Sequence, residues 1–173
     1  MKILLADKLS AHVHENLSAL GAEVVVEPSL KDESLTAALK EHNPNVLVVR
    51  STKVQAEQLQ VAEKLSVIIR AGAGTNTIDV KNASDKGIYV ANCPGKNAVA
   101  VAELTLGHLI NCDRRIADNV QALREHVWAK KQFSKARGLS GRTLAVLGTG
   151  RIGQEVIVRA LAFGMKVQAW SRS

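Results

Sequence analysis

The chain has 173 residues, of which 46% are hydrophobic and 23% are charged, and its formal net charge is +7. This balance excludes an intrinsically disordered or fibrous protein and leaves room for one domain or two small ones. The apolar runs are shorter than the roughly 18–20 residues of a membrane span, and the early Asp7 argues against a signal peptide. The two cysteines, Cys93 and Cys112, lack the spacing of a disulfide framework or a zinc site. We therefore expect reduced thiols, no metal, no membrane association and a cytoplasmic protein.

The positive charge lies in the second part of the chain. Residues 1–97 hold 11 Lys/Arg and 11 Asp/Glu, whereas residues 98–173 hold 12 and 5. A neutral part followed by a basic part indicates two units with different roles. The basic stretch from Arg114 to Arg142 lacks the interleaved aromatic residues and the recognisable modules of nucleic-acid-binding proteins. We therefore expect no nucleic-acid partner.

Short runs rich in Val, Ile and Leu alternate with helical segments in residues 1–97. Continuous apolar runs of this kind are typical of strands buried on both faces of a parallel sheet. Helical periodicity covers residues 9–20, 34–42 and 54–65. This order predicts an α/β fold in which residues 1–97 form a flavodoxin-like, doubly wound parallel sheet. The predicted strands are Lys2–Ala6, Glu23–Val26, Asn45–Arg50, Val67–Arg70 and Ile88–Ala91.

Residues 98–140 predict a connector rather than a further part of the sheet. A long helix with a broad apolar face is expected from about residue 98 to residue 119, and its length is typical of a link between domains. The segment 120–140 is polar, basic and weakly periodic, with Trp128 and Phe133 as isolated aromatic residues.

A new α/β unit begins after Gly141. We expect a strand at Thr143–Leu147, a helix at Arg151–Phe163 and a strand at Met165–Trp170. A parallel sheet of two strands cannot bury both of its faces. Residues 141–173 are therefore expected to be the truncated start of a Rossmann dinucleotide-binding domain, and the chain to be a fragment.

The turn between these two strands has the spacing GxGxxG. Gly148 suits a tight turn, Gly150 suits close approach of a pyrophosphate, and Gly153 suits packing of the helix on the strand. The N-terminus of the helix directs N–H groups towards the phosphates. The motif predicts a dinucleotide site, and the alternative is a strand–helix turn without a ligand.

The residues after the second strand indicate which dinucleotide is preferred. An NAD site usually has Asp or Glu there, whereas this chain has Ser171 and Arg172. An arginine can pair with the 2′-phosphate of NADP, which a carboxylate would repel. The sequence therefore favours NADP over NAD, although NAD would be the cofactor if Arg172 is only solvated.

Three loops follow strands of the first sheet, at residues 49–53, 70–79 and 92–97. Open α/β sheets bind ligands beyond the carboxyl ends of their strands. Gly72 and Gly74 leave backbone N–H groups unobstructed, which suits a carboxylate, and Arg50 and Lys53 could hold a second anion. The alternative for Arg50 alone is a solvated residue at the end of a strand.

The phrases VVRSTKV, RAGAGTNTID, NCPGKNAVAVAEL and LAVLGTGRIGQEV resemble those of the D-isomer-specific 2-hydroxyacid dehydrogenases. The resemblance implies a substrate domain, an NAD(P) domain and, between them, a cleft for a 2-hydroxy or 2-oxo acid. It also implies that Ala73 touches the nicotinamide end and that the connector takes part in a homodimer. It places Arg151 and Ile152 at the pyrophosphate, and the residues that would face the substrate are Arg50, Ser51, Lys53 and Asn97.

The sequence departs from the family pattern in two respects. Ser171 stands in place of the usual acid, and the family's catalytic Arg, Glu and His come from regions beyond residue 173. We therefore assign no catalytic residue in this chain. The histidines are expected to be structural or solvated; they are His12, His14, His42, His108 and His126.

By this resemblance, the leading interpretation is a fragment of an enzyme that acts on 3-phosphoglycerate in serine biosynthesis. Arg50 and Lys53 favour such a phosphorylated acid. A glyoxylate or hydroxypyruvate reductase is an alternative that the Ser171-Arg172 pair favours. A non-catalytic, corepressor-like binding module on the same scaffold is the alternative from another functional class.

The isolated chain should therefore be inactive. With NAD(P) and any of these acids we expect no turnover above a control without protein, because the catalytic acid/base is missing. Cofactor absorbance at 340 nm would report turnover. Activity that is abolished by substitution of one of the five histidines would contradict this prediction.

Overall fold

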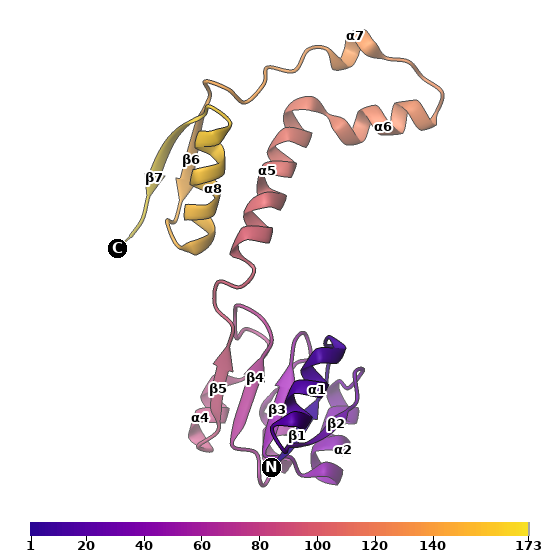
Figure 1. Ribbon diagram of the computed structural model, residues 1–173, viewed down its shortest axis with the longest axis vertical. Helices are drawn as coiled ribbons and strands as arrows, with labels where there is room; N and C mark the ends of the chain where they lie inside the picture. Colours follow the sequence, from indigo (N-terminus) through magenta and orange to yellow (C-terminus); the bar gives the residue numbers. More distant parts are fainter. Residues whose placement is uncertain (173) are drawn as a thin grey trace. The chain divides into compact units, whose positions relative to one another are not determined.

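The apolar runs of the first part of the chain pair as one parallel sheet in the computed structural model, which describes residues 1–172. Only the last residue of the predicted 141–173 unit lies outside the described residues. The strand order is β2-β1-β3-β4-β5 (Figure 1). This is the flavodoxin-like, doubly wound order, so the predicted fold class of this unit is confirmed. The strands are β1 (Lys2–Leu5), β2 (Glu23–Val26), β3 (Val46–Val49), β4 (Val67–Arg70) and β5 (Tyr89–Asn92).

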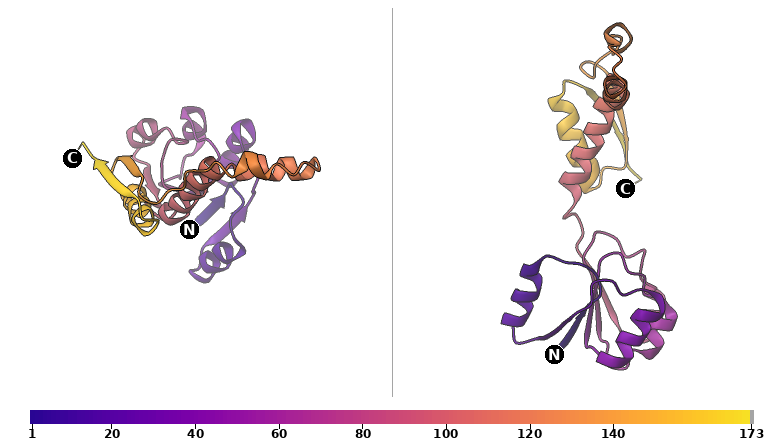
Figure 2. Two further views of the ribbon diagram at one scale, coloured as in Figure 1. Left: turned by 90° about the horizontal axis from the view of Figure 1, so that it is seen from above. Right: turned by 90° about the vertical axis from the view of Figure 1, so that its right-hand side faces the viewer.

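Helices cover both faces of this sheet. On one face α1 (Ala11–Ala19) contributes apolar side chains that pack against β1 and β3. On the other face α2 (Asp32–His42), α3 (Ala56–Val61) and α4 (Val80–Asp85) enclose the larger core. Figure 2 shows α1, in indigo, on the opposite side of the sheet from the other helices of this unit.

Two helices of this unit differ from the sequence prediction for tertiary reasons. The predicted helix 54–65 is shorter, because the N–H of Val54 donates to the carbonyl oxygen of Thr77 (2.9 Å) and the carbonyl oxygen of Val54 accepts the N–H of Asp79 (2.8 Å). Helix α4 was not predicted. Its N-cap residue is Asp79, whose carboxylate accepts the N–H of Asn82 (3.0 Å).

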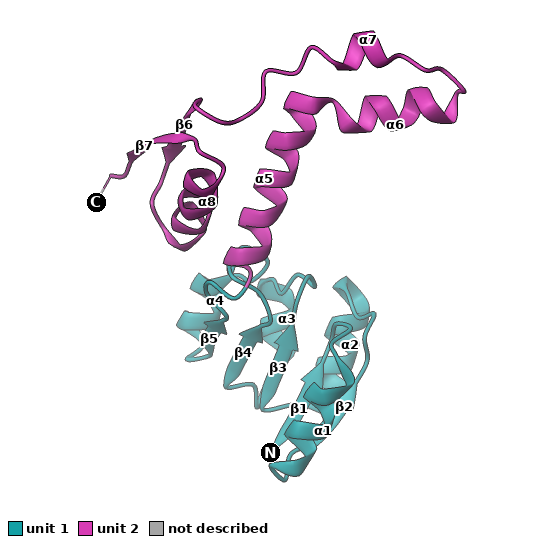
Figure 3. Ribbon diagram, turned by 45° about the horizontal axis from the view of Figure 1, so that its top comes forward, with its two compact units in different colours: residues 1–96 teal, residues 97–173 magenta. Residues whose placement is uncertain are grey.

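The chain divides into two compact units, residues 1–96 and 97–173, which Figure 3 colours separately. The second unit begins with α5 (Ala98–Arg114), followed by α6 (Ile116–Arg124) and α7 (Lys130–Phe133). The predicted single helix 98–119 is therefore wrong at its end.

The break lies at Arg115, which has a left-handed conformation with φ of 52°. Side chains fix the break. The Nε–H of Arg115 donates to Asp118 (2.8 Å), and Asn111 accepts the N–H of Ala117 (2.9 Å).

A buried carboxylate at the end of α5 holds the two ends of the following segment together. The side chain of Asp113 is 6% exposed. It accepts the backbone N–H of Gly138 (2.8 Å) and the Nη1–H of Arg142 (3.1 Å). Residues 115–137, which we call the arm, therefore start and end beside the same residue.

The predicted β–α–β element is present as β6 (Thr143–Leu147), α8 (Arg151–Ala162) and β7 (Lys166–Trp170), with parallel strands. Helix α5 packs against α8 (Figure 1), and Ala102, Leu106 and Val156 form the small core of this unit. Several large apolar side chains of this unit stay exposed to solvent. No helix within residues 1–172 is both long and apolar enough to cross a membrane.

Two glycines of the second unit provide a matched stability test. A Cβ at Gly153 would collide with the carbonyl oxygen of Gly148, whereas a Cβ at Gly107, within α5, would meet nothing within 4 Å. We expect Gly153→Ala to destabilise this unit by about 1–3 kcal/mol or more, because backbone must move. Gly107→Ala should stabilise it by roughly 0.5–1 kcal/mol.

Amide hydrogen exchange in α5 and α8 measures both effects. The control is the first unit, residues 1–96, where protection should not change in either variant. Unaltered or higher protection of α8 in Gly153→Ala would show that the close approach is not needed.

Candidate functional site

The carboxyl edge of the first sheet gathers the loops that follow β1, β3, β4 and β5. Because the strands are all parallel, these loops emerge on the same edge. The strand order reverses between β1 and β3. In doubly wound sheets this reversal opens the crevice in which ligands bind. The centre of the candidate site is therefore the junction of β1 and β3.

Asp7, directly after β1, organises the β3 loop. One carboxylate oxygen accepts the backbone N–H groups of Arg50 (2.7 Å), Ser51 (3.1 Å) and Thr52 (3.0 Å). The other accepts the hydroxyl of Ser51 (2.8 Å). The sequence analysis did not identify this role. The N–H groups of Arg50, Ser51 and Thr52 are thus already used, so any hydrogen bond that these residues donate to a ligand has to come from a side chain.

The charge of Asp7 is stabilised by these donors. Partial burial on its own would raise the pKa of the Asp7 carboxyl, but the N–H groups of Arg50 and Thr52 and the hydroxyl of Ser51 outweigh it and lower the pKa to about 2. Asp7 is therefore a fixed negative charge at neutral pH.

Arg70 shapes the glycine-rich loop after β4. Its Nε–H donates to the carbonyl oxygen of Arg50 (3.2 Å) and its Nη1–H to that of Gly74 (2.7 Å). A Cβ on Gly72 would lie 3.1 Å from this guanidinium, and one on Gly74 would lie 3.4 Å from it. These glycines therefore leave room for the arginine side chain that spans the loop.

The β5 end holds the same loop from its other side. Asn92 donates its amide to the carbonyl oxygen of Ala73 (2.7 Å), and the N–H of Cys93 donates to that of Gly72 (2.9 Å). Within residues 1–172 the N–H groups of Ala73 and Gly74 have no acceptor. The loop thus presents two fixed, free donors, which suits a carboxylate.

Two pockets lie at the β3 loop, and each is lined by one of the two cationic residues predicted to bind an anion. A pocket of about 520 Å³ is lined by Lys8, Leu9, Ser10, Arg50 and Ala71. A pocket of about 550 Å³ is lined by Asp7, residues 28–32, Ser51, Thr52 and Lys53. Arg50 lines the first of these two pockets and Lys53 lines the second. Lys8 was not singled out from the sequence.

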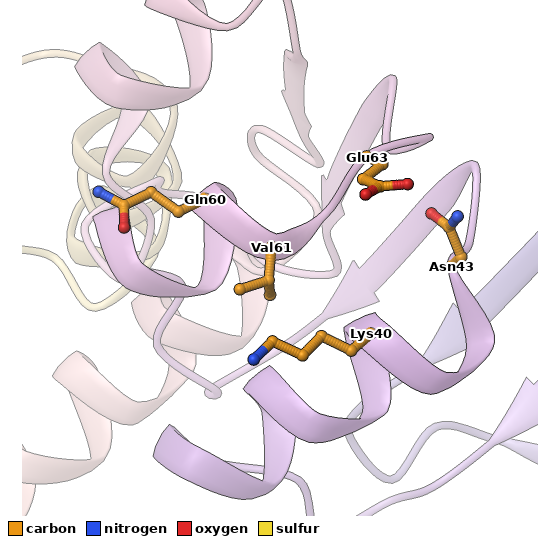
Figure 4. A pocket seen from close by; sticks show the side chains of 5 residues that line it. All are labelled: Lys40, Asn43, Gln60, Val61 and Glu63. Carbon is orange, nitrogen blue, oxygen red and sulfur yellow. The ribbon is translucent and has the colours of Figure 1, made fainter.

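A third pocket has mixed charge and a different place in the fold. Its volume is about 370 Å³, and Figure 4 shows its lining: Lys40, Asn43, Gln60, Val61 and Glu63. It lies at the last turn of α2, away from the carboxyl edge where that helix starts. The amide oxygen of Asn43 already accepts the N–H of Lys64 (3.1 Å). The charges of Lys40 and Glu63 balance, so the pocket has no excess of one charge that would identify a ligand.

The GxGxxG turn of the second unit connects β6 to α8. Gly148 has φ of 102°, and its N–H donates to the carbonyl oxygen of Trp170 (2.7 Å). A Cβ at Gly150 would meet nothing within 4 Å, so there is open space in front of this residue, and Gly153 brings α8 against the turn. The first turn of α8 contains no acid. These features fit a pyrophosphate at the helix N-terminus.

The remaining predicted residues occupy the following places. Arg151 and Ile152 open α8, and Ser171 and Arg172 follow β7 with exposed side chains. Asn97 is the N-cap residue of α5.

The histidines do not form a site. His42 contacts Glu27 (2.5 Å), His12 contacts Glu15 (3.3 Å), and the side chains of the other three histidines are exposed. No cluster of His, Cys, Asp and Glu that could hold a metal occurs among residues 1–172.

The carboxylate of Asp7 should make the stability of the first unit depend on pH. Its pKa is lowered from 3.8 to about 2, so its contribution is complete above about pH 4 and is lost as the pH falls towards 2. We expect Asp7→Asn to cost about 1–2 kcal/mol at pH 7, since a pKa unit corresponds to about 1.4 kcal/mol and solvent screens part of the effect. Urea denaturation at pH 7 and at about pH 2 measures this difference.

Asp85→Asn is the matched control, because Asp85 forms an exposed ion pair with Lys81 (2.9 Å). Its effect should be close to zero. Equal stability of the two variants at pH 7 would contradict the role of Asp7.

Sequence comparisons identify the relatives of this chain. A family model described as "D-isomer specific 2-hydroxyacid dehydrogenase, catalytic domain" matches residues 3–169. The D-3-phosphoglycerate dehydrogenase of Methanocaldococcus jannaschii is 44% identical over 168 residues, which are 96% of this chain and 31% of that protein. The hydroxypyruvate reductase of Thermotoga maritima is 50% identical over 127 residues, 73% of this chain and 41% of that protein.

Solved structures agree. The TT0316 protein of Thermus thermophilus has a TM-score of 0.89 and 31% identity, covering 100% of this chain and 57% of that one. The NAD⁺-bound 3-phosphoglycerate dehydrogenase of Entamoeba histolytica has a TM-score of 0.80 and 30% identity, covering 99% and 54%. The chain thus spans little more than half of these structures and less than half of the curated relatives. Its match to the family model over nearly its whole length confirms the family expected from the motifs: the chain belongs to the D-isomer-specific 2-hydroxyacid dehydrogenases.

Proposed function

We propose that this chain provides the substrate-binding unit, and the first part of the nucleotide-binding unit, of an NAD(P)-dependent D-2-hydroxyacid dehydrogenase acting on 3-phosphoglycerate in serine biosynthesis. The observation that carries the proposal is the pair of free N–H groups of Ala73 and Gly74, held beside cationic side chains at the carboxyl edge of the sheet. The similarity to D-3-phosphoglycerate dehydrogenases supports it.

The substrate carboxylate would accept these two N–H groups. Arg70 and Asn92 fix the loop through the carbonyl oxygens of Gly74 and Ala73, so the two donors need little reorganisation on binding. Arg50 and Lys53 would provide positive charge at the neighbouring β3 loop. Ser51, whose hydroxyl donates to Asp7, would accept from a hydroxyl of the substrate, and Asn97 would also face the substrate. Hydroxypyruvate reduction is the second candidate, since the Thermotoga maritima hydroxypyruvate reductase is a relative at 50% identity.

A bound NAD(P) would supply the hydride acceptor or donor. The chain's own contribution is to hold the pyrophosphate at Gly148, Gly150 and Gly153, with Arg151 and Ile152 in the first turn of α8. Ser171 and Arg172 would contact the ribose. The Gly148–Trp170 hydrogen bond (2.7 Å) ties the end of β7 to the glycine turn, which keeps these two residues beside it.

We further propose a homodimer in the cytoplasm. Helix α6 exposes apolar side chains at helical spacing, among them Val120 (42% exposed) and Leu123 (48%), and Trp128 (78%) is exposed in the segment after it. Such a face is stabilised when a partner covers it. The free cysteines, Cys93 and Cys112, fit a reducing compartment.

NMR titration of the ¹⁵N-labelled chain tests the carboxylate site. D-glycerate should shift the amide signals of Ala73 and Gly74, because both would donate to its carboxylate. Arg70→Gln should weaken binding by about 10-fold or more, because the loop loses the guanidinium hydrogen bonds that fix it. A single hydrogen bond from a charged group contributes about 1.5 kcal/mol.

The control variant is Arg142→Gln, whose guanidinium contacts Asp113 in the other unit. It should bind D-glycerate as the native chain does. If D-glycerate shifts no signal of the β4 loop at tens of millimolar, the proposal fails.

The cofactor preference depends on Arg172. If this side chain pairs with the 2′-phosphate, NADPH should bind at least roughly 10-fold more tightly than NADH. Arg172→Ala should remove that difference by weakening NADPH alone. Ser171→Asp should reverse it, because a carboxylate repels the phosphate and accepts from the ribose hydroxyls.

Fluorescence titration with both reduced cofactors gives the ratio of dissociation constants. Lys166→Ala, at the other end of β7, is the control for loss of a positive charge. A native chain that prefers NADH, with neither affinity altered by Arg172→Ala, would mean that Arg172 is only solvated.

A further inference from the structure

The pocket lined by Lys8, Ser10 and Arg50 has an unbalanced charge. Two cationic side chains line it, and none of its lining residues is acidic. Neither the Nζ of Lys8 nor the guanidinium of Arg50 has a hydrogen-bond or ion-pair partner among the residues that the structure describes. Like charges that share a pocket repel one another, and they attract an anion into it.

The nearest acid does not neutralise this pocket. Asp7 precedes Lys8 in the chain, but its carboxylate accepts the N–H groups of Arg50, Ser51 and Thr52 and lines the other pocket at the β3 loop. That second pocket contains two lysines and two aspartates, so its charges balance. The two neighbouring pockets therefore differ in kind, and the first is the one that suits an anion.

The backbone holds Arg50 from both sides. Its N–H donates to Asp7 (2.7 Å) and its carbonyl oxygen accepts the Nε–H of Arg70 (3.2 Å), while its side chain is exposed. Ser10 makes no side-chain capping hydrogen bond to α1, so its hydroxyl is available as a donor. The pocket is thus built on a fixed residue rather than on mobile surface lysines alone.

The pocket adjoins the proposed carboxylate site. Ala71, which lines the pocket, is the first residue of the glycine-rich loop and is held to β3 by its N–H, which donates to the carbonyl oxygen of Val49 (2.7 Å). Ala73 and Gly74, with their free N–H groups, follow two and three residues later. A small ligand with two anionic groups could therefore be held at both places.

We propose that Lys8, Ser10 and Arg50 bind the phosphate of a short phosphorylated 2-hydroxy acid, and that Lys8 determines the preference for a phosphorylated over an unphosphorylated substrate. This inference rests on the proposed function for the carboxylate site. It adds a residue from the β1 loop to the set expected from the sequence, and it separates the role of Arg50 from that of Lys53.

The test compares three probes on the ¹⁵N-labelled chain: 3-phospho-D-glycerate, D-glycerate and inorganic phosphate. We expect the phosphorylated acid to bind more tightly than D-glycerate. Lys8→Gln should weaken the phosphorylated acid by roughly 5- to 10-fold, as expected for loss of one charge-assisted contact, and should change D-glycerate less than about twofold. Lys86→Gln, an exposed lysine beside α4, is the matched control and should leave the ratio unchanged.

Two results with the acids would overturn the inference. If the preference for the phosphorylated acid persists in Lys8→Gln, or falls only in Lys53→Gln, the phosphate lies elsewhere while the proposed function stands. If Lys8→Gln weakens both acids equally, Lys8 acts on the carboxylate and not on the phosphate.

Inorganic phosphate separates this inference from the proposed function. If neither acid binds, the proposed function fails. Shifts of the Lys8 and Arg50 amide signals by phosphate, lost in Lys8→Gln, would still support an anion pocket. Absence of those shifts as well would refute it.

Discussion

The carboxylate of Asp7 joins the ends of β1 and β3 at the point where the sheet order reverses. At this reversal the connections that follow the two neighbouring strands run in opposite directions. The β3 loop therefore needs another contact to hold it. Asp7 supplies that support through the N–H groups of Arg50, Ser51 and Thr52. Because the loop is held by its backbone, its side chains are directed into separate pockets. Asp7 itself lines one of these pockets, and the other contains no acidic residue.

Arg70 extends this support from the β3 loop to the β4 loop. Arg70 donates to the carbonyl oxygen of Arg50 and to that of Gly74, so the β3 and β4 loops are linked through one guanidinium. The glycines of the β4 loop admit this side chain and leave two N–H groups without acceptors. An acidic residue thus fixes the cationic loop, and a cationic residue fixes the loop that offers N–H donors. Both supporting side chains bind backbone groups, so a ligand need not displace them.

The strands could be predicted from the sequence because both faces of a parallel sheet are buried, and this gives each strand a continuous apolar run. The GxGxxG turn could be predicted because its spacing reflects local geometry. Asp7 and Lys8 could not, because an acid and a lysine after a strand resemble any loop. Their roles depend on partners some forty residues away. The break at Arg115 was missed for a related reason: a left-handed arginine is stabilised by side-chain contacts that propensity does not encode.

The buried carboxylate of Asp113 has a consequence for how this family can vary. It holds Gly138 and Arg142 beside the end of α5, so the arm leaves and re-enters the fold at one point. A loop whose ends are pinned together can change length at small entropic cost, about 0.6 kcal/mol for each doubling. Insertions or deletions at the tip of the arm would therefore leave α5 and β6 in place. The surface proposed for assembly can therefore diversify independently of the glycine turn proposed to hold the nucleotide.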